Sequence, residues 1–220
     1  YWPNINPLRY RSVRKNSLKG KSMIDSKIGE HYNVEFNEIQ FANDELEEVE
    51  FDNCRFKNCD FTGTRFKHCK FIDCQFSQCN LSNIEVGYSR FNEVFFDHCK
   101  MLGIDWTRAH WPNLTLASPL KFSHCILNDS SFHGLKLTEL QLESCKLQDV
   151  DFREGNFSQG NFSGSDFSYS LFNRTELVET DFTDASNYNI DIHLNNIKQG
   201  KFSRDQAINL LIGLDIELVD

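Results

Sequence analysis

The sequence is short of the features that mark several protein classes. It has 4 Pro and 2 Met among 220 residues, and its apolar runs fall short of the ~18 residues that a membrane-spanning helix needs. It also lacks a phosphate-binding glycine-rich motif and the GxSxG, HExxH and CxxC signatures. These absences argue against a helical membrane protein and against the common hydrolases, metalloproteases and redox enzymes, because those chemistries depend on such motifs.

The charge and composition narrow the classes further. Hydrophobic residues make up 40% and charged residues 25%, which is ordinary for a soluble folded protein. The formal net charge of −9 disfavours nonspecific attraction to nucleic acid or to an anionic membrane. Two counts stand apart, namely 20 Phe and 8 Cys. Eight Cys would suit a secreted disulfide framework, yet Tyr1–Leu8 lack the apolar core of a signal peptide.

Large apolar residues recur at every fifth position. The series starts at Phe36 and holds for sixteen consecutive positions to Trp111. It resumes at Phe122, displaced by one residue, and continues to Phe182; Asn187 breaks it, but Ile192, Ile197 and Phe202 are still in frame. Nineteen of the 20 Phe occupy these centre positions, and Phe95 is the exception. The residue two places before each centre is usually small or aliphatic, and all eight Cys lie there.

This period restricts the backbone conformation. A helix turns about 100° per residue, so a five-residue period cannot keep one apolar stripe on a helix. In a flat strand an odd period would turn every second centre outward. Both conflicts disappear if the chain turns a corner every five residues, with the centre and the minus-two residue pointing inward. Four such sides close a square coil of about 20 residues, and coils stack about 4.8 Å apart.

The predicted fold is therefore a β-solenoid of about eight coils, roughly 40 Å long. The motif of a small residue, a polar residue, Phe or Leu and two polar residues resembles the pentapeptide-repeat family over about residues 36–202. The resemblance implies an all-β fold, a right-handed quadrilateral β-helix. Duplex DNA is likewise a narrow rod with regular negative charge, so an acidic rod of this form could occupy the DNA-binding groove of an enzyme.

The cysteines are explained by the stacking of coils. A 20-residue coil places Cys54 under Cys74 and Cys59 under Cys79. Parallel Cβ vectors suit a disulfide torsion poorly, so we expect buried structural thiols, with disulfides or a metal as the alternative. A reducing cytoplasm fits free thiols. The His–Cys pairs at 68–69, 98–99 and 124–125 do not predict a zinc site, because His points outward and Cys inward; we expect no metal and no cofactor.

The chain divides into three parts. Residues 1–22 form a basic extension with six Lys or Arg and no acid, and the remaining body carries a charge of −15. We interpret the extension as non-native or flexible, with a transit peptide as the alternative. Residues 23–202 form the predicted β-helix, interrupted near 111–121, where eleven residues separate Trp111 from Phe122 instead of ten. The interruption predicts a bulge or short projecting loop, with a tolerated one-residue insertion as the alternative.

Residues 203–220 differ in kind from the repeats. Ser203 and Gln206 match a capping box, an apolar stripe follows, and Gly213 is expected to end the helix. Residues 216–219 resemble a short final strand. Such a segment caps the open end of a solenoid and can join two protomers. At the other end, Asp44 takes an inward position within an acidic run, so we expect the coil to be distorted or just beginning there.

Within the family, the layout resembles the Qnr and MfpA type. The supporting features are the total length, the mid-rod interruption, the run LQLESCKL at 140–147 and the tail from Asn187-Tyr188 to Asp215-Ile216. The resemblance implies a cytoplasmic homodimer that binds DNA gyrase and/or topoisomerase IV and protects it from quinolone-type inhibitors. It implies no catalysis, no direct DNA binding and no membrane association. The runner-up hypothesis is a non-enzymatic structural or adaptor protein with another partner; ice binding is remote, because the 8 Thr do not share one column.

Three groups of site residues follow from this resemblance and from the solenoid register. The predicted topoisomerase-contact loop, with Trp111 as an exposed anchor, comprises Arg108, His110, Trp111, Pro112, Asn113 and Leu114. The predicted DNA-mimicking acidic face comprises Glu45, Glu47, Glu48, Glu143, Asp149, Asp151, Glu154, Glu176, Glu179, Asp181 and Asp184. The predicted dimer contact comprises Ile208, Leu211, Ile212, Leu214, Ile216 and Leu218.

Overall fold

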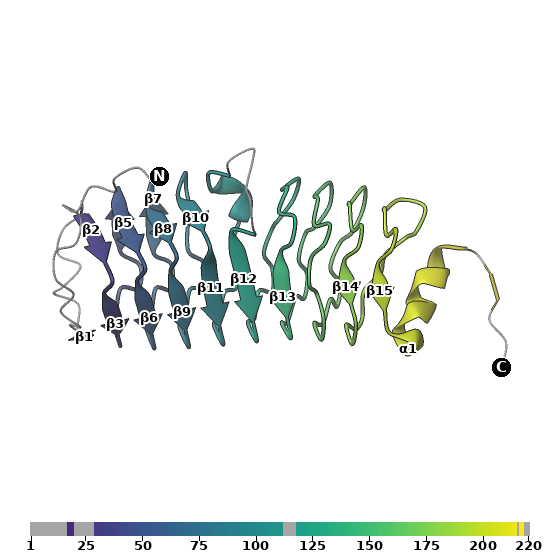
Figure 1. Ribbon diagram of the computed structural model, residues 1–220, viewed down its shortest axis with the longest axis horizontal. Helices are drawn as coiled ribbons and strands as arrows, with labels where there is room; N and C mark the ends of the chain where they lie inside the picture. The colour runs from purple at the N-terminus through teal and green to yellow at the C-terminus, as the bar shows by residue number, and fades with distance from the viewer. Residues whose placement is uncertain (1–16, 20–28, 112–117, 215, 218–220) are drawn as a thin grey trace, which may run out of the picture.

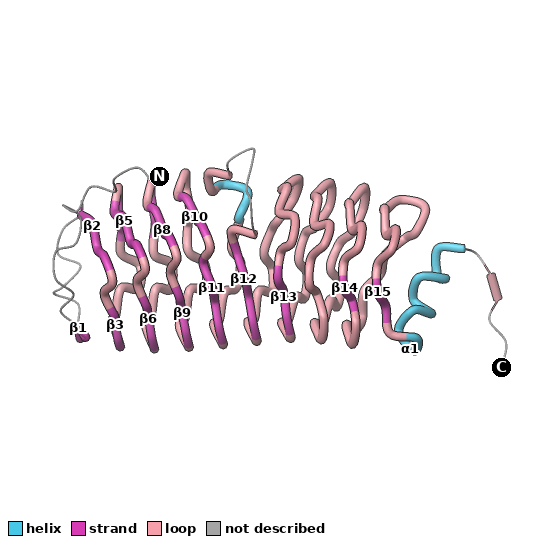
Figure 2. The backbone as a smooth tube through the Cα atoms, in the orientation of Figure 1, coloured by secondary structure: helices cyan, strands magenta, loops and turns pink. Residues whose placement is uncertain are grey.

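The protein is a rod of stacked coils. The computed structural model describes residues 17–19, 29–111, 118–214 and 216–217. The coils follow one another along the rod from the N-terminal end to a helix at the C-terminal end (Figure 1). Short strands of successive coils lie side by side and alternate with turns (Figure 2). This arrangement confirms the predicted all-β quadrilateral β-helix.

Parallel sheets cover the faces of the rod. The largest has seven strands: β1 Ser17–Lys19, β3 Glu35–Asn37, β6 Arg55–Lys57, β9 Gln75–Ser77, β11 Val94–Asp97, β12 Leu120–Ser123 and β13 Gln141–Glu143. A second sheet has β2 Gly29–Tyr32, β5 Val49–Asp52, β8 Lys70–Ile72 and β10 Arg90–Asn92. Two smaller sheets pair β4 Glu45–Glu47 with β7 Arg65–Lys67, and β14 Asp181–Phe182 with β15 Lys201–Phe202. Isolated parallel bridges, such as the one that joins Gln40 to Asp60, continue the ladders between and beyond these strands.

The register confirms the 20-residue coil. Phe36 pairs with Phe56, and Phe56 pairs with Phe76. Their rings stack at centroid distances of 4.9 and 4.4 Å, almost parallel. All eight Cys are buried and free, as predicted. Phe95, the one Phe off the repeat, is only half-buried.

Most corners are made by a residue in the left-handed region, two places after the centre. Asn53, for example, has a φ of 50° and donates its N–H to the carbonyl of Ile72 on the next coil at 2.9 Å. Asn, Asp and Gly tolerate this conformation best, which explains why they recur there. Gly63 combines a φ of 64° with a close approach, because an added Cβ would lie 2.5 Å from Asn43 Oδ1.

The central interruption is larger than a one-residue slip. Trp111 stacks in register on Phe91, 20 residues earlier, whereas Val94 pairs with Leu120, 26 residues later. Six extra residues therefore lie between Trp111 and Ser118. Five extra residues equal one whole repeat and leave the five-residue register unchanged. Only the sixth is therefore visible in the sequence, as an apparent slip of one residue. The alternative of a tolerated one-residue insertion is wrong, and residues 112–117 lie outside the described part of the chain.

The acidic run at 44–52 does not distort the coil. β4 pairs in register with β7, and β5 pairs with both β2 and β8. Asp44 is only partly buried, and its carboxylate accepts a hydrogen bond from the Glu45 N–H at 3.1 Å. The expectation of a distorted or just-beginning coil is therefore wrong, because a preceding coil is already present and the carboxylate has hydrogen-bonding partners.

The C-terminal segment folds differently from the predicted capping box. α1 Arg204–Ala207 is a single turn, and a 3-10 helix, η4 Ile208–Leu214, continues past Gly213 instead of ending there. Ser203 precedes α1 but makes no side-chain cap, because its hydroxyl accepts the Asp184 N–H at 2.8 Å and donates to Asp184 Oδ1 at 3.1 Å. Residues 216–217 are not a strand, and the rest of the predicted strand lies outside the described residues.

Two further differences concern the ends of the repeat. Asn187, at a centre position, turns outward with a φ of 57°, and Tyr188 is buried in its place. At the N-terminus, β1 pairs with β3 and so extends the ladder into the basic extension, which the sequence suggested was non-native or flexible.

Across the described residues, no helix combines the length and apolar character needed to cross a bilayer.

Candidate functional site

The predicted acidic residues do not share one face of the rod. Asp151 bridges Ser131 and Leu171, Glu176 bridges Asn156 and Asn196, and Asp181 pairs with Lys201, and these are three separate ladders. Twenty residues form four sides, so acids whose positions differ by five lie on different sides. The eleven acids of the predicted face are consequently spread around the rod.

Several of these acids are paired with basic side chains. Glu45 accepts from Arg65 at 2.8 Å and lies 3.0 Å from Lys67, and the hydrogen bond from Arg65 is the main reason why its pKa is lowered. Other close pairs are Asp151–Arg153 at 2.7 Å, Glu154–Arg174 at 3.0 Å and Asp181–Lys201 at 3.2 Å. Such pairs leave less net field for a cationic partner, although each contributes little stability at the surface.

One corner of the solenoid carries acids and amides on both sides of the insertion. The coil that contains the insertion is the exception: its residue at this corner is Pro119, which is buried and directly precedes Leu120, the partner of Val94. The other corner residues all have positive φ, all are exposed, and each is an acid or an amide. No described residue at this corner is basic. We call this column the acidic corner; it consists of Asn33, Asn53, Asp73, Glu93, Glu139, Gln159, Glu179 and Gln199.

The acidic corner is held in line by the coil ladder. Glu139 N donates to the Ser158 carbonyl at 2.9 Å, and Glu179 N donates to the Lys198 carbonyl at 2.9 Å, so successive corner residues repeat one geometry. Gln159 Nε2 donates to Glu179 Oε2 at 3.2 Å. Sequence reasoning included only Glu179 from this column. Counting in 20-residue coils would have found the rest on each side of the six-residue insertion.

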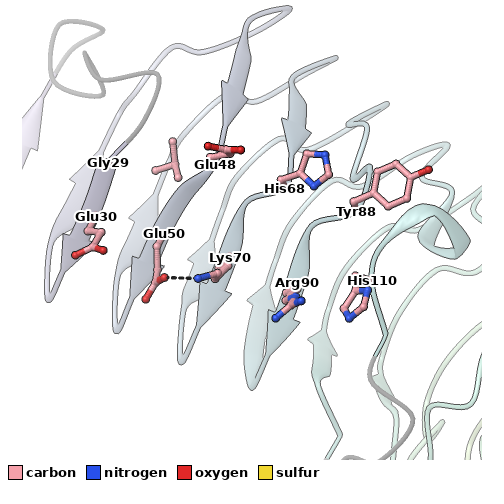
Figure 3. A pocket seen from close by; sticks show the side chains of 10 residues that line it. Gly29, Glu30, Glu48, Glu50, His68, Lys70, Tyr88, Arg90 and His110 are labelled. Carbon is pink, nitrogen blue, oxygen red and sulfur yellow. Dashed lines mark hydrogen bonds and ion pairs between the residues drawn. The ribbon is translucent and has the colours of Figure 1, made fainter.

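A groove of mixed charge lies beside the central insertion, lined by three glutamates together with Lys70 and Arg90 (Figure 3). Glu50, Lys70 and Arg90 follow one another on β5, β8 and β10, and Lys70 Nζ lies 2.8 Å from Glu50 Oε2. At the adjoining corner, the rings of His68 and Tyr88 stack 5.2 Å apart, and Tyr88 is 70% exposed. Aromatic and cationic side chains together suit contact with another macromolecule.

The predicted contact loop borders this groove. His110 lines the groove and is exposed. Arg108 lies at the end of η3 Trp106–Arg108, is exposed, and pairs with Asp105 at 3.4 Å. Trp111 is not the exposed anchor that was predicted, because it packs against the core and its Nε1 donates to the Trp106 carbonyl at 2.9 Å. The other three predicted loop residues, Pro112, Asn113 and Leu114, lie outside the described residues.

Sequence reasoning missed His68, Tyr88 and Arg90 in this groove. A 20-residue spacing places the first two at one corner, which is the signal that could have found them.

The predicted dimer residues are partly accessible. Ile208 is 51% and Ile216 is 53% exposed, whereas Leu211 and Leu214 are half-buried. Leu210, which was not predicted, packs against the end of the core. The side chain of Ile212 and the whole of Leu218 lie outside what the structure describes.

Comparison with known proteins places the chain in a family. A family model for the pentapeptide repeat region matches residues 30–106 and 104–182. A trypsin-treated form of QnrB1, a plasmid-mediated fluoroquinolone resistance protein, superposes with a TM-score of 0.62 at 20% identity, covering 94% of this chain and 100% of that chain. Full-length QnrB1 gives a TM-score of 0.55 at 19% identity, covering 92% and 100%. No curated protein matches by sequence. With the five-residue repeat, the square coil and the family model in agreement, the chain belongs to the pentapeptide-repeat family.

Proposed function

We propose that the protein is a DNA mimic that binds a type II topoisomerase, DNA gyrase or topoisomerase IV, and protects it from quinolone-type inhibitors. The acidic corner carries this proposal. It presents carboxylates and amides along the rod at multiples of the coil spacing of about 4.8 Å. None of the described residues in this column is basic. A DNA-binding enzyme offers a basic surface shaped for a charged rod of similar width.

The remaining charge distribution supports the same partner. The body from residue 23 onward has a net charge of −15, so long-range attraction to a basic groove is strong at low ionic strength and weakens as salt is added. The mixed-charge groove at His68, Tyr88 and Arg90, with Arg108 and His110 beside it, adds aromatic and cationic side chains for local contacts. In this proposal the acidic corner lies in the DNA-binding channel, and the groove with the central insertion contacts the protein around it.

The likeness to QnrB1 supports the fold and suggests the same role. The exposed Ile208 and Ile216 at the C-terminal end would join two protomers, which doubles the length of the acidic rod. In this role the protein performs no chemistry and acts by occupying a surface. Localisation in the cytoplasm follows from the partner and agrees with eight free thiols.

The decisive experiment measures gyrase supercoiling, and topoisomerase IV decatenation, in the presence of ciprofloxacin. Added protein should restore activity. Deleting residues 112–117 removes the six residues in excess of a 20-residue coil, so the ladder can close in register. The deletion should abolish protection while leaving the thermal transition close to that of the unaltered protein. Unaltered protection by the deletion variant would contradict the role of the insertion.

A matched pair of charge reversals tests the acidic corner. Glu139→Lys with Glu179→Lys should raise the protein concentration needed for half-protection by about tenfold or more, because repulsion replaces attraction. The control is Asp129→Lys with Asp149→Lys, which changes the net charge equally at another corner with the same positive φ. Equal losses in both variants would show that net charge, and not the corner, decides binding.

Dimerisation is tested at the C-terminus. Ile208→Asp should convert the dimer to a monomer in sedimentation velocity experiments. Leu194→Asp is the control, because Leu194 is similarly exposed, at 48% against 51%, but lies outside the helical segment. No effect of the protein on either enzyme at any concentration, with a stable dimer intact, would favour an adaptor protein with another partner.

A further inference from the structure

Two histidines meet at a corner on the seven-stranded face. His98 and His124 stack with ring centroids 4.7 Å apart and an interplanar angle of 6°. Both have left-handed backbones, with φ of 51° and 53°, and both side chains are exposed. Asp97 lies beside them, and one ligand atom from each of the three side chains is within 4.8 Å of the others.

The two histidines occupy the same corner on either side of the coil that contains the insertion. His98 N donates to the Ser123 carbonyl and His124 N donates to the Glu143 carbonyl, so both residues occupy the same place on successive coils. The coil between them spans 26 residues, as the Cys99 N–H to Cys125 Sγ hydrogen bond shows. The insertion lengthens the chain between the two histidines but leaves them in register on successive coils.

Each imidazole is oriented through Nδ1. Nδ1 of His98 donates to Asp97 Oδ1 at 2.9 Å, and Nδ1 of His124 lies 2.8 Å from Ser123 Oγ. A carboxylate on one nitrogen fixes the tautomer and raises the basicity of the other nitrogen, which is the arrangement found behind metal-bound histidines. Both Nε2 atoms are then presented by neighbouring coils on a rigid backbone.

We propose that Asp97, His98 and His124 form a binding site for one divalent first-row transition-metal ion, such as Cu²⁺, Ni²⁺ or Zn²⁺. Imidazole nitrogen suits these ions better than Ca²⁺ or Mg²⁺, which prefer oxygen ligands. The two histidines are the principal ligands. Asp97 either orients His98 or takes a third position by rotation of its side chain, and water completes the coordination.

Binding requires at least one ring to change its orientation. The lone pair of an imidazole nitrogen lies in the ring plane, and the two planes are now almost parallel, so they must tilt to direct both nitrogens at one ion at about 2.0–2.1 Å. His98 has a side chain that is 57% exposed, so it can tilt toward His124 without disturbing the core. Glu143, on the next coil after Ser123, adds negative charge nearby, which favours a dication.

Calorimetric titration of the full chain, prepared without a polyhistidine tag, tests the site. Ni²⁺ and Zn²⁺ should each bind with one-to-one stoichiometry. His98→Gln and His124→Gln should each weaken binding by about tenfold or more, and Asp97→Asn should weaken it by about tenfold through loss of orientation. The matched control is His68→Gln, because His68 is also an exposed corner histidine but stacks on Tyr88 and should have no effect.

Absorption spectra separate this site from the eight thiols. The Cu²⁺ or Co²⁺ complex should lack thiolate-to-metal charge-transfer bands, and metal should raise the thermal midpoint of the unaltered protein but not of His98→Gln. The proposal is overturned if no binding occurs at millimolar metal, if the His98→Gln and His124→Gln variants bind as well as the original, or if thiolate bands appear. None of these outcomes depends on topoisomerase binding.

Discussion

The two halves of the rod build the same coil with different interiors. Coils at residues 29–111 stack phenylalanines on phenylalanines and place Cys at six of the sixteen minus-two positions, and they form the strands from β2 to β11. Coils at residues 118–202 place Ser or Thr at several minus-two positions, and most of their ladder consists of isolated bridges. The coil geometry therefore tolerates a wide change of inward chemistry.

What the halves share is the hydrogen bond made by the minus-two side chain. Cys79 Sγ lies 3.5 Å from the Phe56 carbonyl, and Ser165 Oγ lies 2.6 Å from the Leu142 carbonyl, in both cases 23 residues earlier. The same side chain accepts a backbone N–H, from Cys59 in one case and Cys145 in the other. A thiol does this weakly and a hydroxyl does it strongly. Aromatic stacking thus predominates in the first half, and buried hydrogen bonds predominate in parts of the second.

Removing one central ring from each half is expected to have the largest effect. Phe76→Ala and Phe157→Ala should each cost about 3–5 kcal/mol of unfolding free energy. The loss of unfolding free energy should be larger for Phe76→Ala, because the Phe76 ring is stacked between those of Phe56 and Phe96, with centroid distances of 4.4 and 5.0 Å. Phe157 makes only edge and tilted contacts. Urea denaturation measures both. A larger loss at Phe157 would remove stacking as the distinguishing feature.

Alkaline pH should separate the halves next. Burial raises the pKa of Cys69 from 9.0 to about 11. Below pH 9 the thiol is protonated in both states, and between pH 9 and about 11 only the unfolded chain loses the proton, so stability falls as pH rises. Cys69 lies in the first half, whose amide protons should therefore lose protection first in hydrogen exchange.

The control for the alkaline effect is Cys69→Ser. Ser89 already occupies the next coil of the same column, where its hydroxyl accepts the Cys69 N–H at 3.0 Å, so serine fits this position. The variant should show a shallower decline in the urea midpoint between pH 9 and 11. An unchanged slope would assign the alkaline loss to other groups.

A pair of alanine substitutions compares the two kinds of hydrogen bond. Ser165→Ala should cost about 1–3 kcal/mol, because a buried N–H and a carbonyl lose a strong partner. Cys79→Ala should cost less from hydrogen bonding, since sulfur donates and accepts weakly. Urea midpoints measure both. Equal or reversed losses would show that side-chain volume, and not the hydroxyl, sets the stability of the second half.

The smallest effect is expected at the end of the second half. The buried Tyr188 hydroxyl has no hydrogen-bond partner among the described residues, and burial raises its pKa. Tyr188→Phe should therefore leave stability unchanged or raise it by up to about 1 kcal/mol. Tyr169→Phe is the control, because Tyr169 is 75% exposed. A clear loss at Tyr188 would reveal a partner for its hydroxyl.

The coil could be predicted from the sequence because one repeated constraint determines it. Nineteen Phe in a period of five leave no helix and no flat strand, so the square solenoid follows. What escaped prediction lies where that period is ambiguous or broken. A six-residue insertion looks like a slip of one, and a capping-box pattern cannot show that Ser203 is already bonded to Asp184. Replacement of Asn187 by Tyr188 in the core likewise depends on the local turn.

The candidate site was less predictable than the fold. Outward residues have no inward constraint, so their grouping depends on counting whole coils. A 20-residue spacing relates neighbouring coils within each half, but the spacing across the insertion is 26 residues. The continuity of the acidic corner and the His98–His124 pair therefore became visible only in the structure. The exposed anchor role of Trp111 failed for a related reason, because its in-register position put it against Phe91.

The 20-residue coil also has a consequence for how the chain folds. Nearly every ladder contact joins residues about 20 apart in a chain of 220, so the relative contact order is about 0.1, in the range of helical bundles and not of β-sandwiches. Once two adjacent coils have formed, each further coil needs only its own 20 residues to close. We therefore expect this all-β protein to fold by sequential growth from a local nucleus, at rates more typical of helical domains.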